Sequence, residues 1–375
     1  KRGFDHAGWG HAAARGEDKH MSSVLTPSTL AELAAAVGSA PRVIPVGAGT
    51  KPRLSEVPGG VGRISTAKLA GIVEYEPSEF TFTAQAGTPL REIVAALGER
   101  GQYLPFDPML AAAGATLGGT VAAGLSGPGR WRFGGLRDFI LGVRFVDGEG
   151  RVLRMGGKVV KNAAGFDLPK FFVGSAGRFG VLAEISFKVF PRPLALHTLR
   201  LEAKDDAVKV RILTACAGTR WELDALDAAV HEPAVYARLG GPPEAIAALA
   251  REVLARFPGV MLTEDEAAVW WRAVVEFGWA HAGGTLAKVA LTPLQVPEFA
   301  TWVRAQTEAQ GWISAGGNVG YVSLPPGAAA PASPWPGVGL RGAGPLWLGP
   351  RRNFAVMQAV KAALDPVNRF PSLEE

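Results

Sequence analysis

The stretch that decides the fold runs from residue 156 to residue 191 and reads GGKVVKNAAGFDLPKFFVGSAGRFGVLAEISFKVFP. It contains the spacing G-x-x-G-x-x-G at Gly174, Gly177 and Gly180. Glycines at this spacing let backbone amides approach a flat or phosphorylated ligand where a Cβ atom would collide. Residues 181–189 then alternate apolar and polar side chains, which predicts a half-buried strand. The pattern indicates a ligand site, although a tight packing turn without a ligand uses the same glycines.

The composition describes a globular chain of 375 residues with 48% hydrophobic and 19% charged residues, enough for two domains with separate cores. No apolar run approaches the roughly 18 residues that span a bilayer. A single cysteine, Cys216, excludes an internal disulfide and favours a reducing compartment. The 39 basic and 34 acidic residues are interspersed, as on a solvated surface. We therefore expect a cytoplasmic protein with no nucleic-acid partner and no direct membrane insertion.

The first twenty residues differ from the rest. They hold three of the six histidines, at positions 6, 11 and 20, with little apolar periodicity, and Met21 follows them. We expect residues 1–20 to be an artificial leader or a disordered segment, and we expect no metal site in the chain.

A second glycine turn precedes this stretch in the sequence. Residues 42–46 are predicted to form a short strand that runs directly into Gly47-Ala48-Gly49-Thr50-Lys51. A pyrophosphate is bound by free backbone amides, a hydroxyl donor and a cation, and this turn offers all three. The turn is not a Walker loop, and Pro52 stands where a Rossmann fingerprint would place its third glycine. It is either a phosphate cradle of another kind or only a turn.

A third segment, residues 114–124, consists almost entirely of small residues. It follows a predicted strand at residues 80–85 and a helix that begins at Thr88, and it precedes a predicted hairpin from Asp138 to Met155. With so little side chain to bury, we expect backbone laid against something flat instead of an ordinary core helix. Close helix packing is the alternative.

In this order, the segments 45–50, 105–108, 115–119, 137–142, 161–167 and 174–177 resemble the FAD-binding domain of the vanillyl-alcohol-oxidase, or PCMH, type. The resemblance covers about residues 25–195. The paired lysines and the short length are most similar to the smaller FAD-binding subunit of bacterial glycolate oxidase. The resemblance implies an α+β fold with a two-subdomain FAD-binding domain and a smaller α+β cap.

The implied domain limits follow the composition of the chain. Residues 21–195 would form the FAD-binding domain and residues 196–310 the cap, which covers the flavin and chooses the substrate in that superfamily. Residues 311–375 would be a C-terminal segment that returns to the FAD domain. Within the cap, adjacent Trp270 and Trp271 are either core residues or a surface that faces a partner, because both cannot be expected to face one core.

The resemblance also implies which residues bind the cofactor. Residues 47–51 would hold the pyrophosphate of FAD. Thr50 stands where covalent members of the superfamily have a histidine, which implies noncovalent FAD. The complete set of expected cofactor contacts is Pro45, Gly47, Ala48, Gly49, Thr50, Lys51, Pro108, Gly114, Ala115, Thr116, Gly118, Gly119, Ala122, Gly124, Lys161, Gly174, Gly177, Gly180 and Val181.

The catalytic residues are not assigned by the sequence. Relatives that act on 2-hydroxy acids carry a histidine-rich metal and base motif where this chain has residues 314–321, SAGGNVGY, without a histidine or an aspartate. His281 is the histidine that we place nearest to a pocket. Hydride transfer to a flavin needs a proton acceptor and a cation for the carboxylate.

The expected function is therefore that of an FAD-dependent oxidoreductase subunit. It would belong to a glycolate-oxidase-like complex that converts a 2-hydroxy acid to a 2-oxo acid, in an electron-transfer or accessory role. Its partners would be a larger flavin subunit and an iron–sulfur subunit, and these partners could bring it to a membrane. The alternatives are a self-sufficient flavin oxidase or dehydrogenase of a small alcohol or sugar acid, and a non-catalytic scaffold.

Overall fold

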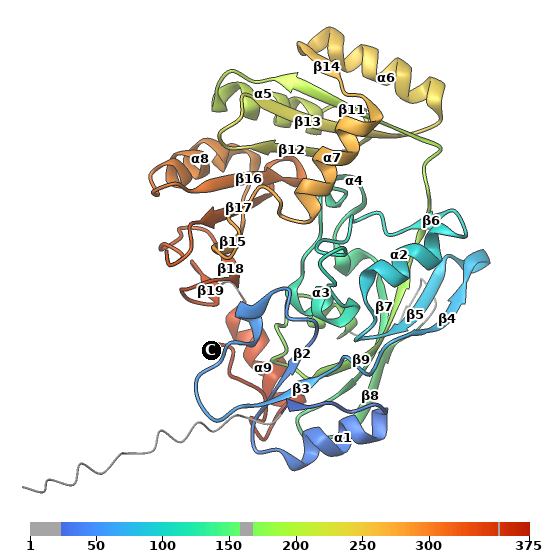
Figure 1. Ribbon diagram of the computed structural model, residues 1–375, viewed down its shortest axis with the longest axis vertical. Coiled ribbons are helices and arrows are strands. Elements are labelled where there is room, and N and C mark those ends of the chain that lie inside the picture. The colour runs from blue at the N-terminus through green and yellow to red at the C-terminus, as the bar shows by residue number, and fades with distance from the viewer. Residues whose placement is uncertain (1–23, 158–167, 352) are drawn as a thin grey trace, which may run out of the picture.

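The computed structural model describes residues 24–157, 168–351 and 353–375. Figure 1 shows two regions, which we call the N-terminal region and the nine-stranded sheet region. The first holds the strands from β1 to β10, and the second holds those from β11 to β19. The last helix, α9 (Phe354–Leu364), leaves the second region and packs beside the first.

A small parallel sheet begins the N-terminal region. Its strand order is β1-β3-β2, with β1 at Val24–Leu25, β3 at Gly62–Ser65 and β2 at Val43–Val46. Helix α1 (Leu30–Ser39) begins at Thr29, whose side chain accepts a hydrogen bond from the backbone N–H of Glu32. The sequence predicts this cap, because Thr29 and Glu32 have the spacing of a capping box, and the cap satisfies one of the free amides of the first turn.

The N-terminal region also holds a five-stranded antiparallel sheet, in the order β4-β5-β9-β7-β8, and a two-stranded antiparallel sheet of β6 (Gln102–Tyr103) and β10 (Phe190–Pro191). The predicted hairpin after residue 138 is confirmed, since β7 and β8 pair directly and the side chain of Asp147 accepts hydrogen bonds in the turn between them. The bounds are β4 Ile72–Glu76, β5 Thr81–Gln85, β7 Ile140–Val146, β8 Val152–Gly156 and β9 Val181–Lys188.

Two helices cover the core of this sheet. Helix α2 (Leu90–Gly98) buries Leu90, Ile93 and Leu97. Helix α3 (Leu117–Ala123) lies in the segment of small residues, so our expectation that this segment would not form a core helix is wrong. The helix forms because Leu117 and Val121 are fully buried and its glycines allow close packing. A Cβ atom on Gly118 would lie 2.8 Å from the Cβ of Ala86.

The second region is built on a sheet with nine strands in the order β14-β11-β13-β12-β16-β17-β15-β18-β19, and its neighbouring strands pair antiparallel. The sequence predicts strands at residues 196–203 and 285–292, and both are confirmed as β11 and β15. The bounds are β11 Ala195–Glu202, β12 Leu223–Ala229, β13 Ala234–Gly241, β14 Gly259–Met261, β15 Thr285–Ala290, β16 Gln310–Ser314, β17 Val319–Leu324, β18 Gly337–Arg341 and β19 Trp347–Leu348.

The two faces of this sheet bury different elements. On β13, Val235, Ala237 and Leu239 belong to one core with α5 (Asp206–Ala217), α6 (Pro243–Arg256) and α8 (Val296–Arg304). Tyr236, which alternates with them, belongs to the core that the sheet shares with the N-terminal region and with α7 (Glu264–Val275). This alternation follows from the two-residue period of a strand.

Helix α7 resolves the interpretation of its two adjacent tryptophans. Trp270 stacks on Tyr236 with ring centroids 3.8 Å apart, and Trp271 donates from Nε1 to the hydroxyl of Thr198 at 2.9 Å. The two indoles meet edge to face at 4.5 Å. Both therefore pack against the same sheet, and our premise that they cannot face one core is wrong, because each lies over a different strand.

The C-terminal segment divides at residue 348. Residues 310–348 contribute β16 to β19 to the nine-stranded sheet, although we placed the start of a returning segment at residue 311. Residues 310–348 also contact the first region, where the hydroxyl of Tyr321 donates to the carbonyl of Ser126 at 3.4 Å, but α9 and the tail after it pack wholly beside that region. The backbone N–H of Val43 donates to the carbonyl of Arg369 at 2.8 Å, and that of Gly148 donates to the carbonyl of Leu364 at 2.9 Å.

In the part of the chain that the structure describes, no helix is long and apolar enough to cross a membrane.

Candidate functional site

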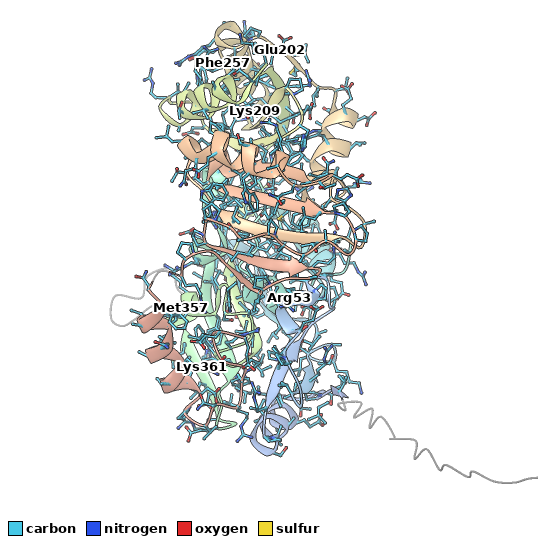
Figure 2. All side chains as sticks on the ribbon, turned by 90° about the vertical axis from the view of Figure 1, so that its left-hand side faces the viewer. Arg53, Glu202, Lys209, Phe257, Met357 and Lys361 are labelled. Carbon is cyan, nitrogen blue, oxygen red and sulfur yellow. The ribbon has the colours of Figure 1, made fainter. Side chains whose placement is uncertain are left out.

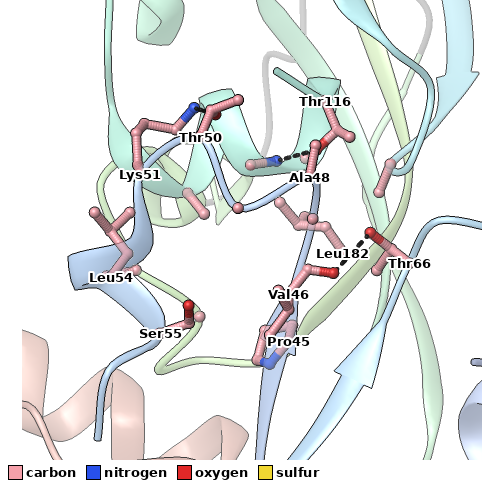
Figure 3. A pocket seen from close by; sticks show the side chains of 18 of the residues that line it. Pro45, Val46, Ala48, Thr50, Lys51, Leu54, Ser55, Thr66, Thr116 and Leu182 are labelled. Atoms are coloured by element: carbon pink, nitrogen blue, oxygen red, sulfur yellow. Dashed lines mark hydrogen bonds between the residues drawn. The ribbon is translucent and has the colours of Figure 1, made fainter. Parts of the chain in front are cut away.

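A pocket in the N-terminal region brings together three segments that are far apart in the sequence (Figure 3). The first segment follows β2, the second begins α3, and the third precedes β9. Its lining residues are Pro45, Val46, Gly47, Ala48, Gly49, Thr50, Lys51, Leu54, Ser55, Thr66, Ala86, Thr116, Gly118, Gly119, Ala122, Ser175, Ala176, Gly177, Gly180 and Leu182.

The first wall presents backbone amides. From Gly47 to Lys51, no backbone N–H group donates a hydrogen bond within the described part of the chain. Gly49 has a φ of +70°, the left-handed conformation that favours glycine. Successive amides in such a turn form a concave site for an anion. These amides line the pocket without an acceptor from the described part of the chain, so this wall fits an anionic ligand.

Lys51 supplies the charge of the pocket. Its side chain is 7% exposed, and its Nζ donates to the Oγ1 of Thr50 at 2.9 Å. Among the described residues that line the pocket, no other is charged. Burial lowers the pKa of Lys51 to about 8, because the ammonium loses its hydration without gaining a carboxylate partner. An anionic ligand would restore that compensation.

The second wall fits tightly against the first. Thr116 caps α3 by accepting a hydrogen bond from the backbone N–H of Gly119 at 3.2 Å. The same Oγ1 would lie 2.5 Å from a Cβ atom on Gly47, which is closer than such atoms ever approach. Glycine at position 47 is therefore required by the cap of the neighbouring helix.

The third wall is a loop in the left-handed conformation. Ala176 and Gly177 have φ values of +48° and +76°. A Cβ atom on Gly177 would lie 2.7 Å from the Cγ of Pro45, so this loop packs closely on the end of β2. The glycines of the deciding stretch thus form one side of a pocket whose other sides come from residues 45–55 and 116–122.

The structure brings most of the expected cofactor contacts together and separates the others. Gly124 and Gly174 line an adjoining cleft, and Lys161 lies outside the described residues. Pro108, Gly114, Ala115 and Val181 do not line the pocket. The expected residues that line it are Pro45, Gly47, Ala48, Gly49, Thr50, Lys51, Thr116, Gly118, Gly119, Ala122, Gly177 and Gly180.

The residues outside the pocket have structural explanations. The side chains of Ala115 and Val181 are fully buried in two different hydrophobic cores. Gly114, with a φ of +88°, shapes the turn before α3. Pro108 forms a bridge with Ser126.

Eight residues that line the pocket were not expected from the sequence. Ser175 and Ala176 lie between the glycines already singled out, so their position was a usable signal. Thr66 follows β3, and its hydroxyl donates weakly to the carbonyl of Val46 at 3.5 Å. Only the tertiary structure reveals this contact. The others are Val46, Leu54, Ser55, Ala86 and Leu182.

A larger cleft adjoins the pocket, and Leu54, Ala122 and Ala176 line both. The pocket has a volume of about 80 Å³. The cleft has a volume of about 750 Å³ and lies between the N-terminal region and β15 and β18 of the nine-stranded sheet.

Lys288 of β15 is a half-buried cation of this cleft. Its Nζ donates to the carbonyl of Gly124 at 2.7 Å, and it forms no ion pair in the described part of the chain. Burial, and then the charge of Arg130, lowers its pKa to about 8. The carboxylate of Asp138 also lines the cleft, where it accepts a hydrogen bond from the backbone N–H of Gly135 at 2.9 Å.

The segment that replaces the histidine-rich motif is held by a buried carboxylate. Asp227 accepts hydrogen bonds from Ser314 and from the backbone N–H of Ala315. Burial raises the pKa of Asp227 to about 6. His281, the histidine that we placed nearest to a pocket, bonds through Nε2 to the carbonyl of Glu308 and lines neither the pocket nor the cleft. Within residues 24–157, 168–351 and 353–375, no cluster of three or more His, Cys, Asp or Glu residues could hold a metal ion.

Comparison with known proteins agrees with this geometry. The sequence model of the FAD binding domain matches residues 21–156. The chain is 41% identical to the glycolate oxidase subunit GlcE of Escherichia coli over 226 residues, which cover 59% of this chain and 61% of that protein. It is 31% identical to the glycolate oxidase subunit GlcD of Bacillus subtilis over 158 residues, which cover 42% of this chain and 33% of that protein.

Other similarities concern the fold and more distant sequences. A D-2-hydroxyglutarate dehydrogenase of Xanthomonas citri pv. viticola is 29% identical over 39% of this chain and 31% of its own length. The chain thus spans less than two thirds of each of these curated relatives. A solved structure of alkyldihydroxyacetonephosphate synthase superposes with a TM-score of 0.65 at 16% identity, over 92% of this chain and 74% of that one. Residues 21–156 therefore match the FAD binding domain, the chain has an α+β fold similar to that of alkyldihydroxyacetonephosphate synthase, and it is similar in sequence to the glycolate oxidase subunit GlcE.

Proposed function

We propose that this chain is the FAD-binding subunit of a glycolate-oxidase-like complex that oxidises a 2-hydroxy acid to a 2-oxo acid. The observation that carries the proposal is the first wall of the pocket, where the amides of residues 47–51 lack acceptors beside the buried ammonium of Lys51. Two similar proteins are named as glycolate oxidase subunits, which supports this choice of reaction.

Each part of the pocket would have a separate task toward the cofactor. The amides of residues 47–51 and Lys51 would bind the pyrophosphate, and Gly118 and Gly119 would admit the neighbouring ribitol chain close to α3. The cleft would receive the remaining part of the dinucleotide. FAD, when bound, supplies a two-electron acceptor. The residues of this chain bind and orient it and exclude water from the pocket.

We propose an accessory or electron-transfer role for the chain within the complex. Such a role is supported by residues 314–321, which pack against Asp227 and carry no base. A larger flavin subunit and an iron–sulfur subunit would be the partners. If partners hold the complex at a membrane, this chain would reach it through them.

One observation favours a second candidate, a self-sufficient flavin dehydrogenase of a small hydroxy acid. Lys288 faces the cleft without an ion pair in the described part of the chain, so it would neutralise a substrate carboxylate there. The two candidates differ in one measurement. Anaerobic addition of glycolate or D-lactate to the isolated, FAD-loaded chain would bleach the flavin absorbance only if the chain oxidises the acid itself.

Purification of the full-length chain tests the cofactor. We expect a yellow protein whose flavin passes into the supernatant after acid precipitation, because Thr50 offers no ring nitrogen for covalent attachment. Flavin in the pellet would contradict noncovalent binding. A colourless protein that does not bind added FAD would leave only the scaffold alternative.

Co-expression with the larger flavin and iron–sulfur subunits tests the complex. We expect the three chains to co-purify and glycolate to bleach the flavin of the complex, while the isolated chain stays yellow. If the chain fails to co-purify with either partner, the proposed assembly is wrong, whatever its affinity for FAD.

A further inference from the structure

Arg178 is a buried cation beside the cofactor pocket that the proposed function does not yet use. It follows Gly177 in the third wall and is 0% exposed. Its Nη1 donates to the carbonyl of Leu54 at 2.6 Å and to the carbonyl of Ala176. Its Nε and Nη2 are buried without a hydrogen-bond partner in the described part of the chain.

The charge of Arg178 lacks a contacting counter-ion. No ion pair joins it to a carboxylate among the described residues, and its neighbours Arg53 and Arg351 add charge of the same sign. Burial lowers its pKa to about 10, Glu375 opposes the shift, and the two arginines contribute to it. A buried and uncompensated charge destabilises a folded protein unless a ligand supplies its counter-ion.

The two carbonyl groups that Arg178 binds belong to the walls of the pocket. Leu54 stands in the first wall, as Figure 3 shows, and Ala176 stands in the third. Since both carbonyl oxygens accept from the guanidinium, neither is free to point toward an anion in the pocket. Arg178 thereby joins the segment after Lys51 to the glycine loop and keeps two negative dipole ends out of the site.

We propose that Arg178 is a positioning residue for the pyrophosphate of FAD. The bound pyrophosphate completes the compensation of the buried charge of Arg178 across the wall of the pocket. This proposal rests on the proposed binding of FAD and adds a residue that does not line the site. The free chain would then carry a charge that is unfavourable until the cofactor binds. Replacement of Arg178 by an apolar side chain of similar length should therefore not destabilise the FAD-free chain, but it should weaken the binding of FAD.

Arg178→Met in the full-length chain tests this opposition. We expect the FAD-free variant to unfold at a urea concentration equal to or higher than that of the wild type. We expect its Kd for FAD to rise at least tenfold, because the wall loses its charge and its two carbonyl contacts. Arg178→Lys should recover part of the affinity, since it retains the charge.

Lys209→Met is the matched control. Lys209 is also buried, at 2% exposure, and donates to two carbonyls, those of Ala229 and Val230, but it has a carboxylate partner in Asp206 at 3.6 Å and lines neither the pocket nor the cleft. We expect this control to lower stability and leave the Kd for FAD unchanged. Binding of ADP, which carries the diphosphate, should weaken in Arg178→Met, and binding of riboflavin, which carries none, should not change.

The outcomes separate the two proposals. If Arg178→Met fails to fold, or loses as much stability as Lys209→Met, or binds FAD within twofold of the wild type, the role of Arg178 is wrong. If the wild type binds neither FAD nor ADP, the proposed function itself is wrong.

Discussion

At the scale of single residues, the pocket is marked by polar groups that lack a hydrogen-bond acceptor or a counter-ion in the described part of the protein. The amides of residues 47–51 line the pocket without a hydrogen-bond acceptor from the described part of the chain, and the buried ammonium of Lys51 has no carboxylate partner there. A folded chain tolerates such groups at a binding site, where a ligand completes them. This is the physical basis for assigning the cofactor phosphate to this wall.

Lys51→Met should weaken FAD binding by about ten- to hundredfold, because a hydrogen bond to a charged group contributes about 1.5–3 kcal/mol. Isothermal titration with FAD measures the change. Lys204→Met, at an exposed lysine, is the control and should have no effect. Equal affinity in Lys51→Met and the wild type would contradict the assignment of the phosphate.

The same lysine predicts how binding depends on pH. Its pKa is lowered to about 8 by burial, and a bound dianion favours the protonated form and raises that pKa. Below pH 8 the ammonium is already charged, so affinity should be constant. As pH rises above 8 the free chain must take up a proton to bind FAD, and affinity should fall. A titration series from pH 6.5 to 9.5 should lose this slope in Lys51→Met, and an unchanged slope would disprove the origin that we give.

At the scale of elements, the turn after β2 and the helix α3 fit only together. Gly47→Ala should weaken both folding and FAD binding, since its Cβ atom would meet the Oγ1 of Thr116 at 2.5 Å. In a Thr116→Ala background the obstacle is gone, although loss of the cap costs about 1 kcal/mol. Urea unfolding should be measured for the wild type, the two single variants and the double variant. Gly47→Ala should lower the free energy of unfolding less in the Thr116→Ala background than in the wild type. Additive costs would mean that the two elements are not coupled.

Helix α9 is fastened by a buried ion pair. Lys361 donates to Asp365, which also accepts from the backbone N–H groups of Arg369 and Phe370. Figure 2 places Lys361 on α9 in the lower half of the molecule, beside the N-terminal region. Asp365→Ala leaves a buried cation, and it should lower the free energy of unfolding by about 3–5 kcal/mol.

Urea denaturation measures that loss, with Glu375→Gln as the control. The ion pair of Glu375 with Arg42 is partly exposed, at 26% and 39%, and its removal should cost about 1 kcal/mol or less. Similar losses in both variants would show that α9 is not held by its buried pair.

At the scale of the whole molecule, charged pairs fix the nine-stranded sheet to the N-terminal region. Arg238 of β13 pairs with Asp107, which also accepts from the backbone N–H of Gly129 at 2.6 Å. Arg132 of the first region pairs with Asp224 of β12 at 2.7 Å. Because these pairs are largely buried, they set the orientation of the sheet and therefore the shape of the cleft.

Arg238→Met should lower the free energy of unfolding by about 3 kcal/mol, because it leaves Asp107 without its cation. Calorimetry should show the two regions unfolding in separate steps where the wild type unfolds in one. The control Arg304→Met removes a pair with Asp206 that lies within the sheet region, with the arginine 42% exposed, and one transition should remain. A single transition in Arg238→Met would contradict this role.

The sequence by itself determined the local structure and the type of site. The alternation of residues 181–189, the cap at Thr29 and the hairpin at Asp147 each depend on near neighbours, so each was predictable. The glycine turns were also visible, because positive φ and close approach leave a trace in residue type. The PCMH-type fold followed from the order of these segments.

Only the tertiary structure decided which segments meet. The helix at residues 117–123 was missed because its stability comes from packing on Ala86 and the sheet and not from its own side chains. Arg178 donates to the carbonyls of Leu54 and Ala176, and Leu54 lies 124 positions before Arg178 in the sequence. Nothing in the local sequence marks either contact. Burial and pairing of charges are properties of the assembled fold, so the roles of Arg178 and Lys288 could be argued only from it.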